Sequence, residues 1–493
     1  MKRLMLIITL QLFFVVAFSQ YTTPGTGVNW TMNDLVTNSN GVVTGTSGNY
    51  TINSDLTIAQ NDTLTFINDG EYEILCNQGV LITVKGTMLA LLDNAEVNSV
   101  TFLGGENNFK GFTFTGSNGS VLKNININKA GGVKLIESDV YFRNCKFEVF
   151  NMENCTGAVD IYKSNPVLSL CSFSHNEGPA IKSAANAESA PIIDSCLIMH
   201  NVMGNINMPQ INLGTTPVDD TIRITNSMVV APATDQAGGI AVSTLAGGTL
   251  NAIIENTIIS EGRYGIAVFG NNIFTIIKNN QVEFNIDADP MQGGSGITFW
   301  GDDSNISIIS GNKIHNNLWG VTILNNAKPD LGDTENTLSP GENEIYNNGN
   351  NGQVYDVYNN TAQNIKAENN YWGTNNADTI EAHIYHNFDD PSLGVVDYIP
   401  FIISEEIPEN LTSEKSKINV YPVPANKILH IELTEKTCGK IQVYNTQGVI
   451  VKNFKQNNKN VNLDVSSWNN GVYYIILKQN NITEGIRKIV IQH

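Results

Sequence analysis

The chain has 493 residues, of which 41% are hydrophobic and 15% are charged. Residues 20–414 carry 15 Lys+Arg and 43 Asp+Glu, whereas residues 415–493 carry 11 and 4. The change of sign predicts two modules, and the acidic module is a poor partner for nucleic acid. The 6 cysteines are too sparse for a disulfide scaffold, and no CxxC motif or Cys/His cluster indicates zinc.

The N-terminus has the features of a secretory signal peptide. Lys2 and Arg3 precede a short apolar run, and Ala17-Phe18-Ser19 supplies small residues at the cleavage site. We therefore expect residues 1–19 to be removed on export. No later stretch approaches the ~18 apolar residues of a membrane helix, so we expect no transmembrane segment in the mature protein.

The first mature segment resembles a cap. In NWTMNDLVTNS (residues 29–39), Thr31 can cap a short helix, with Asp34 three residues further on. Trp30 and Leu35 would then cover the first apolar layer of the fold that follows.

A short pattern then recurs along the chain. A glycine is followed by Ile or Val, one variable residue and another apolar residue, as in GIAVFGNN (265–272), GITFWGDD (296–303) and GVTILNNA (320–327). Upstream of most copies lies a second piece, an asparagine followed by a short apolar pair. Such repeats of two short strands with glycine and asparagine between them are typical of a β-solenoid.

The second piece aligns ten residues in one column, separated by roughly 20 to 32 residues, which is the range of solenoid coils. The column contains Ile125, Cys145, Cys171, Cys196, Ser227, Thr257, Asn280, Asn312, Asn343 and Asn370. We interpret its three cysteines as small apolar core residues. A disulfide between neighbouring coils is the alternative, because coil spacing is compatible with one.

These repeats resemble the right-handed parallel β-helix superfamily that includes pectate lyases and other sugar-processing enzymes. The predicted fold class is therefore all-β, with a right-handed parallel β-helix over residues 20–401, capped at both ends, and a small C-terminal β-sandwich. The resemblance rests on pattern, so it implies fold rather than activity.

The alternation of inward and outward residues predicts a candidate sugar site. If Ile266, Ile297 and Val321 point inward, then Phe269, Trp300 and Leu324 stack on the outer face, with Asn271, Asp302 and Asn326 beside them. An aromatic ledge next to polar groups suits a carbohydrate. The alternative is that a loop covers these side chains.

Catalytic residues are harder to assign. Hydrolysis needs two carboxylates across the glycosidic bond, and Asp302 and Asp303 are adjacent in sequence. A lyase needs a base, for which Arg263, Lys313 and His315 are candidates. Asp287 and Asp289 could bind Ca²⁺, although solvated loop carboxylates explain them as well.

The solenoid is expected to end in AENNYWGTNNADTIEAHIYHNFDDPSLGVVDYIPF (367–401), which resembles a terminal segment of secreted bacterial β-helix proteins. Tyr371-Trp372-Gly373 would close the last coils. DTIEAHIY would form a short helix with Ile380 and Ile384 facing inward, and VVDYIPF a final strand.

Residues 402–414 are polar and non-periodic, which predicts a linker. The remainder, residues 415–493, contains alternating strands separated by turns, which is typical of a β-sandwich. It carries several ordered motifs: Tyr421-Pro422-Val423-Pro424-Ala425, Val443-Tyr444-Asn445 with Gly448, Leu463-Asp464-Val465-Ser466, Gly471-Val472-Tyr473-Tyr474, and Lys488.

These motifs resemble the type A C-terminal sorting domain of the type IX secretion system of Bacteroidota, which usually has Asn at the position of Val423. The resemblance implies Tyr421, Pro422, Pro424, Ala425, Gly448, Gly471 and Lys488 as parts of the sorting signal. It also implies the type IX machinery as partner, and an extracellular or cell-surface location. An ordinary carbohydrate-binding sandwich is the alternative.

Three functions therefore stay open for a chain that we expect to be monomeric. It binds an extracellular polysaccharide or serves in adhesion, it is a polysaccharide lyase or glycoside hydrolase, or it is purely structural. The paired-Asp, Gly-His-Gly and Arg-Ile-Lys elements of polygalacturonase-like enzymes are absent from the sequence. We favour glycan binding.

Overall fold

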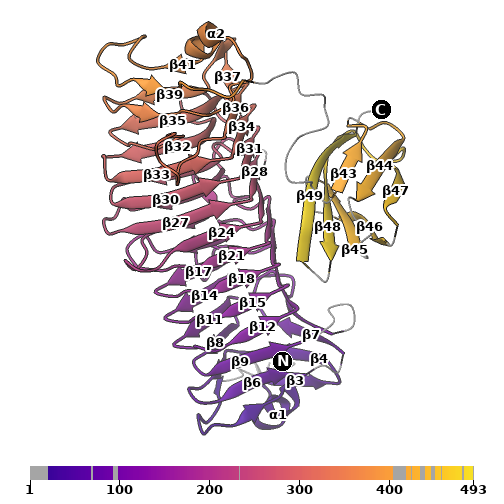
Figure 1. Cartoon of the computed structure of the whole chain (residues 1–493). Coiled ribbons are helices and arrows are strands. Elements are labelled where there is room, and N and C mark those ends of the chain that lie inside the picture. The colour runs from indigo at the N-terminus through magenta and orange to yellow at the C-terminus, as the bar shows by residue number, and fades with distance from the viewer. Residues whose placement is uncertain are drawn as a thin grey trace, which may run out of the picture.

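The computed structural model describes residues 20–67, 70–92, 98–232, 234–403, 418–423, 425–433, 439–445, 450–456, 458–479 and 482–491. The predicted signal peptide, most of the predicted linker, Cys438, Pro424 and Gly448 lie outside these residues. The described chain forms a long solenoid, with a small β-domain beside it (Figure 1).

Three long sheets, here called A, B and C, form the walls of the solenoid. Within the described residues they have 14, 11 and 13 strands, respectively. Sheet A contains β1 (Tyr21–Thr22), β5 (Leu56–Ile58), β8 (Leu81–Val84), β11 (Gly111–Thr115), β14 (Val133–Ile136), β17 (Val159–Tyr162), β20 (Ile181–Ser183), β23 (Pro209–Leu213), β26 (Gly238–Ser243), β29 (Ile266–Phe269), β32 (Ser295–Gly301), β35 (Trp319–Asn325), β39 (Val357–Asn360) and β41 (Ile384–Tyr385).

Sheet B contains β2 (Asn29–Trp30), β6 (Thr63–Phe66), β9 (Thr87–Leu91), β12 (Val121–Lys123), β15 (Tyr141–Arg143), β18 (Val167–Ser169), β21 (Ile192–Asp194), β24 (Ile222–Thr225), β27 (Leu250–Glu255), β30 (Ile273–Lys278) and β33 (Asn305–Ser310). Sheet C contains β3 (Val43–Thr46), β4 (Asn49–Ile52), β7 (Glu71–Cys76), β10 (Ser99–Gly104), β13 (Ile125–Asn128), β16 (Lys146–Glu148), β19 (Ser172–Ser174), β22 (Leu197–Met199), β25 (Met228–Val230), β28 (Ile258–Ser260), β31 (Gln281–Glu283), β34 (Lys313–His315) and β36 (Glu344–Tyr346).

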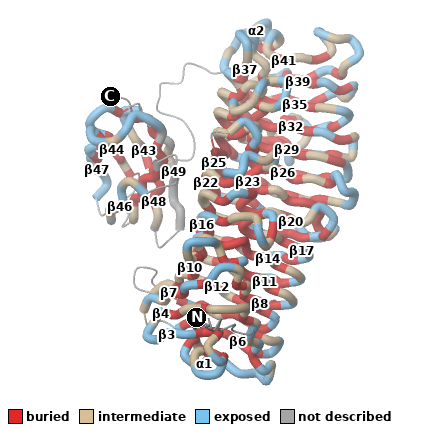
Figure 2. Tube along the Cα trace, turned by 180° about the vertical axis from the view of Figure 1, so that it is seen from behind, coloured by how far each residue is buried: buried red, intermediate tan, exposed pale blue. Residues whose placement is uncertain are grey.

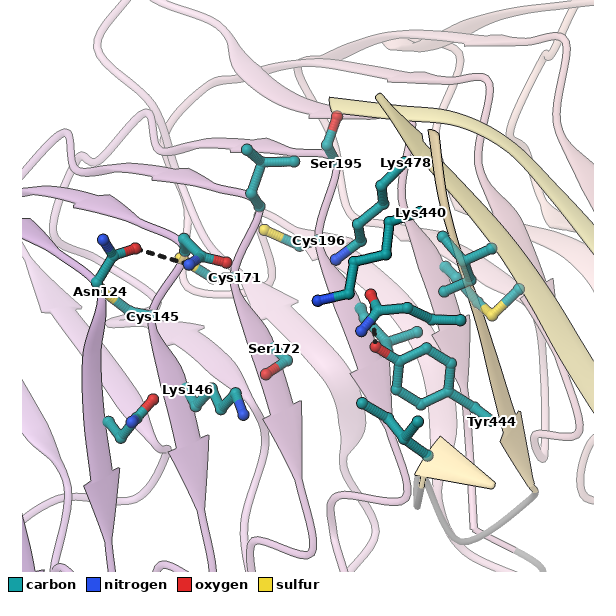
Figure 3. Close-up of a pocket in the computed structure, with 18 of the residues that line it drawn as sticks. Asn124, Cys145, Lys146, Cys171, Ser172, Ser195, Cys196, Lys440, Tyr444 and Lys478 are labelled. Carbon is teal, nitrogen blue, oxygen red and sulfur yellow. Dashed lines mark hydrogen bonds between the residues drawn. The ribbon is translucent and has the colours of Figure 1, made fainter. Parts of the chain in front are cut away.

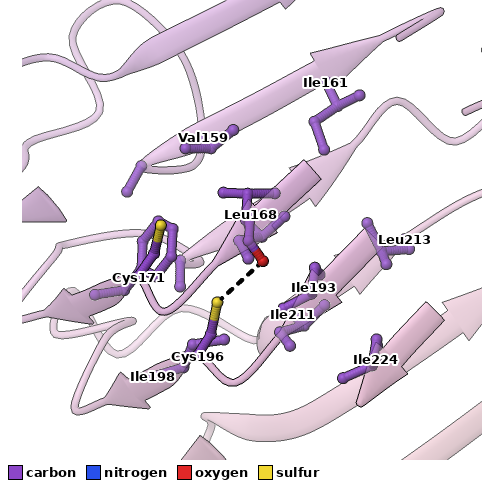
Figure 4. Close-up of a cluster of buried hydrophobic side chains, with 14 of the residues drawn as sticks. Val159, Ile161, Leu168, Cys171, Ile193, Cys196, Ile198, Ile211, Leu213 and Ile224 are labelled. Atoms are coloured by element: carbon purple, nitrogen blue, oxygen red, sulfur yellow. Dashed lines mark hydrogen bonds between the residues drawn. The ribbon is translucent and has the colours of Figure 1, made fainter. Parts of the chain in front are cut away.

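Most coils contribute one strand to every sheet, although sheet B ends at β33, and neighbouring coils pair in parallel apart from the antiparallel β3 and β4. The fold is the right-handed parallel β-helix that the sequence predicts. Because side chains alternate along a strand, every second residue points into the solenoid. Isoleucine, valine, leucine and phenylalanine fill these positions in file, so buried residues recur along the walls (Figure 2). Ile193, Ile198 and Ile211, on the consecutive strands β21, β22 and β23, are examples (Figure 4).

The predicted column lies at the sharp turn from sheet B to sheet C. Each of its ten members follows a residue with a φ between 51° and 64°, a left-handed conformation that asparagine and glycine adopt readily. This explains why asparagine so often precedes the column. The three column cysteines, Cys145, Cys171 and Cys196, are buried and free. Cys196 donates from Sγ to the Leu168 carbonyl at 3.4 Å (Figure 4).

In the C-terminal half the same column is a ladder of buried asparagines. The side-chain carbonyl of Asn312 accepts from the backbone N–H and from Nδ2 of Asn280, both at 2.9 Å. Asn343 accepts from Asn312 in the same way, and Asn370 from Asn343. The ladder satisfies buried turn amides from one coil to the next.

A second ladder occupies the turn from sheet C to sheet A, through Asn285, Asn317 and Asn348. Its last acceptor is the buried carboxylate of Asp356, which also lies 3.2 Å from Nδ1 of His383. Burial raises the pKa of Asp356, opposed by the hydrogen bonds from His383 and Asn348.

The N-terminal cap has the predicted form. Helix α1 (Met32–Asn38) begins after Thr31, whose side chain accepts from the Asp34 amide at 3.2 Å, while Asp34 accepts from the Thr31 amide at 2.9 Å. Trp30 and Leu35 are buried in the core. The carboxylate of Asp62 also binds the N-terminal segment, through four N–H donors of residues 25–30.

The C-terminal cap differs from the expected helix over residues 378–385. Helix α2 (Ala377–Ala382) ends earlier, and Ile384 lies in β41, where it pairs with Val357. The reason is that sheet A offers a free strand edge, and pairing there satisfies the backbone of residues 384–385. Ile380 and Ile384 are both buried, as expected, and Trp372 closes the core.

Two small pairs complete this end of the solenoid: β37 (Gly349–Asn350) with β38 (Gln353–Val354), and β40 (Ile365–Lys366) with β42 (Val396–Asp397). His386 is buried, donates to Glu381 Oε1 from Nε2 at 2.7 Å, and accepts from the Val396 amide. Both of its ring nitrogens thus have structural partners.

The C-terminal domain consists of two antiparallel sheets. One contains β43 (Ile418–Tyr421), β44 (Ile428–Leu433) and β47 (Asn460–Asp464). The other contains β46 (Ile450–Gln456), β45 (Gly439–Asn445), β48 (Gly471–Gln479) and β49 (Ile482–Ile491). The domain has a hydrophobic core of its own, separate from that of the solenoid.

Candidate functional site

The outer face of sheet A carries the predicted ledge. Strand pairing places Phe269 beside Trp300, and Trp300 beside Leu324. The residues that directly precede the three ledge residues, Val268, Phe299 and Ile323, are fully buried. Trp300 is 41% exposed, so its ring is available to a ligand.

Four further aromatic side chains, here called the aromatic cluster, gather at the C-terminal end of the same sheet: Trp319, Tyr355, Tyr358 and Tyr385. The ring centroids of Trp319 lie 4.4 Å from Tyr355 and 5.0 Å from Tyr358, and Tyr358 stacks on Tyr385 at 4.8 Å. All four side chains are partly exposed. Burial, with Tyr385 and Tyr355 nearby, raises the pKa of Tyr358, so its hydroxyl stays protonated at neutral pH.

The ledge and the cluster belong to one surface. Leu324, the strand neighbour of Trp300, pairs with Asn360, which lies two residues after Tyr358 on β39. Strands about 4.8 Å apart with 3.3 Å per residue place the Cα atoms of Trp300 and Tyr358 roughly 12 Å apart. The Trp319 indole donates from Nε1 to the Pro290 carbonyl at 2.9 Å, which holds this ring in place.

The polar residues beside the ledge form turns. Asn271 accepts from the Asp302 amide at 2.9 Å, and Asp302 accepts from the Ser304 amide at 2.9 Å as well as from its hydroxyl. These bonds from Ser304 hold the pKa of Asp302 below its ordinary value, so its carboxylate is ionised at neutral pH. Asn326 is exposed. These groups can accept hydrogen bonds from sugar hydroxyls or donate hydrogen bonds to them. Because it is ionised, Asp302 is unsuited to be a general acid.

The structure does not gather the catalytic candidates. Arg263 and His315 precede the sheet A strands of their coils, whereas Asp302 and Asp303 follow the end of β32. Seven residues of strand separate these positions, which is roughly 20 Å. Arg263 is moreover engaged by the Asn207 side chain and the Gln292 carbonyl, and His315 stacks on Tyr346 with a centroid distance of 5.2 Å.

The two candidate metal ligands, Asp287 and Asp289, also have different surroundings. Asp289 caps a turn by accepting from the Met291 amide at 2.8 Å. The pKa of Asp287 is raised by burial and by the nearby Glu261 and Asp235, and Asp289 is not among the groups that affect it. In the described part of the chain, no group of three or more His, Cys, Asp or Glu side chains is arranged to hold a metal ion.

Of the residues that the resemblance implies for sorting, the structure describes five. Tyr421 is exposed and stacks on His430, and Ala425 is buried, donating its amide to the Val490 carbonyl at 2.8 Å. Pro422 follows β43, and Gly471 opens β48 with a φ of 152°. The backbone of Lys488 pairs with that of Tyr474.

Sequence reasoning missed the aromatic cluster. Tyr358 lies in a coil without the recurring glycine, and Trp319 and Tyr355 belong to connections or strand ends whose direction alternation alone does not define. The signal that could have found them was the density of aromatic residues between Trp319 and Tyr385.

Comparison with known proteins identifies one part of the chain. Residues 419–492 match the model of the secretion system C-terminal sorting domain. No curated protein matches the chain. Among solved structures, the periplasmic alginate epimerase AlgG is similar, with a TM-score of 0.43 and 14% sequence identity over 76% of this chain and 84% of that chain.

Among the described residues, no helix is long and apolar enough to cross a membrane. The residues that carry the family match are those of the β-domain beside the solenoid, β43 to β49. The chain thus ends in a type IX secretion sorting domain, which directs it to the cell surface or the extracellular space.

Proposed function

We propose that the solenoid binds an extracellular polysaccharide along the outer face of sheet A and does not cleave it. The observation that carries this proposal is the exposed Trp300 beside the aromatic cluster on the outer face of one sheet. Sugar rings pack their C–H faces on such side chains, while hydroxyls bond to neighbouring amides and carboxylates.

The charge of the solenoid favours a neutral glycan. Residues 20–414 carry 28 more acidic than basic side chains, and their arginines are only Arg143, Arg223 and Arg263. A polyuronate would be repelled at long range.

The separation of the catalytic candidates supports binding without cleavage. Glycoside hydrolysis needs two carboxyl groups roughly 5 to 9.5 Å apart across the bond, one of them protonated. Asp302 is held in its ionised form, and Arg263 is committed to a loop contact.

A glycan array probed with the purified full chain tests the proposal, followed by calorimetric titration of the glycans that bind. Trp300→Ala and Tyr358→Ala are expected to weaken binding on the order of tenfold each, or about 1.4 kcal/mol. Phe274→Ala is the matched control, because Phe274 is also 41% exposed but lies on sheet B.

Two outcomes would contradict the proposal. If no glycan binds, or if Phe274→Ala weakens binding as much as Trp300→Ala, the ledge is not a sugar site. New reducing ends or the absorbance of unsaturated sugars, abolished by Asp302→Asn or Arg263→Ala, would instead establish a hydrolase or a lyase.

A further inference from the structure

Several residues of the sorting domain are buried although they do not belong to its own hydrophobic core. In β45 and β48, Ile441, Val443, Ile475 and Leu477 face the core of the domain. The residues that alternate with them, Gln442, Tyr444, Tyr474 and Ile476, point the other way, yet they are only 8%, 8%, 1% and 3% exposed. A sandwich of two sheets leaves its outer faces open to water, so another part of the chain covers them.

The covering surface is sheet C of the solenoid (Figures 1 and 3). The Tyr474 ring packs in a buried apolar cluster with Met199, Met228 and Val230. Its hydroxyl donates to Glu261 Oε1 at 3.0 Å. Tyr474 therefore contributes both an apolar contact and a directed hydrogen bond to the other body of the chain.

The composition of sheet C changes where the domain lies. Away from the contact, outward positions are polar, as in Lys313 and His315 of β34 and Glu344 of β36. Beneath Tyr474, the outward positions of β22, β25 and β28 are Leu197, Met199, Met228, Val230 and Ile258, with Ser260 as the one polar residue among the six. Outward residues do not fill the solenoid core, so this apolar patch requires a different partner.

The charges and the packing at this contact indicate an association that is stable but reversible. The sorting domain carries 7 more basic than acidic residues, opposite in sign to the solenoid. Beside the Tyr474 contact, a cavity of about 500 Å³ remains between the two bodies. It is lined by Lys146 of the solenoid and by Lys440, Lys455 and Lys478 of the domain (Figure 3). A polar, like-charged lining of this kind adds little affinity.

We propose that the outer face of sheet C from β22 to β28 is a docking surface for the chain's own sorting domain, with Tyr474 as its anchor. The domain packs against the solenoid, so this contact holds it in addition to the covalent connection. Cutting the linker therefore leaves the domain bound non-covalently, and its release is a separate dissociation step.

The test uses the purified full chain with a specific protease site inserted in the segment 404–414. After complete cleavage, the two pieces of the otherwise unaltered chain are expected to co-elute on size exclusion at micromolar concentration. Tyr474→Ala and, from the solenoid side, Met228→Glu are expected to weaken the association at least tenfold and to separate the pieces. Tyr421→Ala is the matched control, because Tyr421 is 50% exposed in the same domain.

Circular dichroism and melting of the uncut variants show whether each fold is intact. In the uncut chain, an amine-reactive cross-linker is expected to join Lys146 to Lys440, and Met228→Glu to abolish this product. Separation of the unaltered pieces after cleavage would overturn the proposal. So would co-elution that survives both Tyr474→Ala and Met228→Glu, or a shift in mass showing that two solenoids associate through sheet C.

Discussion

The asparagine ladder leads to a quantitative prediction for Asn312→Ala. Asn312 is fully buried, and its side-chain carbonyl is the acceptor for the backbone amide of Asn280 at 2.9 Å. Its Nδ2 also donates to the Ile277 carbonyl at 2.8 Å. Alanine leaves at least one buried N–H without a partner and removes a donor from a buried carbonyl, and each such loss costs about 1–3 kcal/mol. We expect the opening free energy of the surrounding coils to fall by about 2–4 kcal/mol.

Hydrogen exchange measured by mass spectrometry on the full chain is the appropriate assay, because a protein of two bodies does not unfold in a single step. Peptides from residues 254–345 are expected to exchange roughly 30- to 1,000-fold faster in Asn312→Ala, since each 1.36 kcal/mol is a factor of ten. Asn326→Ala, at an exposed position directly after β35, should change exchange less than threefold. Equal protection in the two variants would refute the ladder as a source of stability.

Three further predictions concern buried polar groups. Asp62→Ala should lower the opening free energy of residues 20–30 by roughly 2–4 kcal/mol, visible as faster exchange there, because four donors lose their acceptor. Burial, aided by His175, lowers the pKa of His200 to about 4, below that of the unfolded chain. Its contribution to stability is thus complete above pH 6.5 and is lost as the pH falls towards 4, by at most about 3 kcal/mol; His200→Phe should flatten this part of a denaturation–pH profile. Burial raises the pKa of Cys171 well above its ordinary value, so a thiol reagent at pH 8 should leave it unmodified until the protein is denatured.

The repeat and the turn column were predictable because both depend on local backbone requirements. A residue with a left-handed backbone conformation must precede each column position, so asparagine recurs there in successive coils. The alternation of inward and outward residues likewise follows from strand geometry, which is why the position of Trp300 beside Phe269 could be derived. The second ladder was not found, since Asn285, Asn317 and Asn348 are joined to the next strand by connections of unequal length.

The periodicity of the sequence predicts which residues point outward, but it does not predict which part of the chain they contact. Met199 and Met228 look like ordinary members of apolar strands, and nothing in their own coils distinguishes them from core residues. Tyr474 stands next to Tyr473 in one motif, yet Tyr473 faces the domain core and Tyr474 the solenoid. Only the meeting of segments about 250 residues apart reveals the contact, because it depends on the path of the whole chain.

The two proposed binding surfaces lie on different sheets of the solenoid. The aromatic residues of the candidate glycan site lie on sheet A or, in the case of Tyr355, just before one of its strands, whereas every solenoid residue that packs with Tyr474 lies on sheet C. A sorting domain docked on sheet C therefore leaves Trp300 exposed, as its surface in the full chain demonstrates. Since the two faces share no side chain, loss of glycan binding in Trp300→Ala and loss of docking in Tyr474→Ala are independent. Each proposal can fail without the other, and a change in one property caused by the other variant would point to a rearrangement of the coils between them.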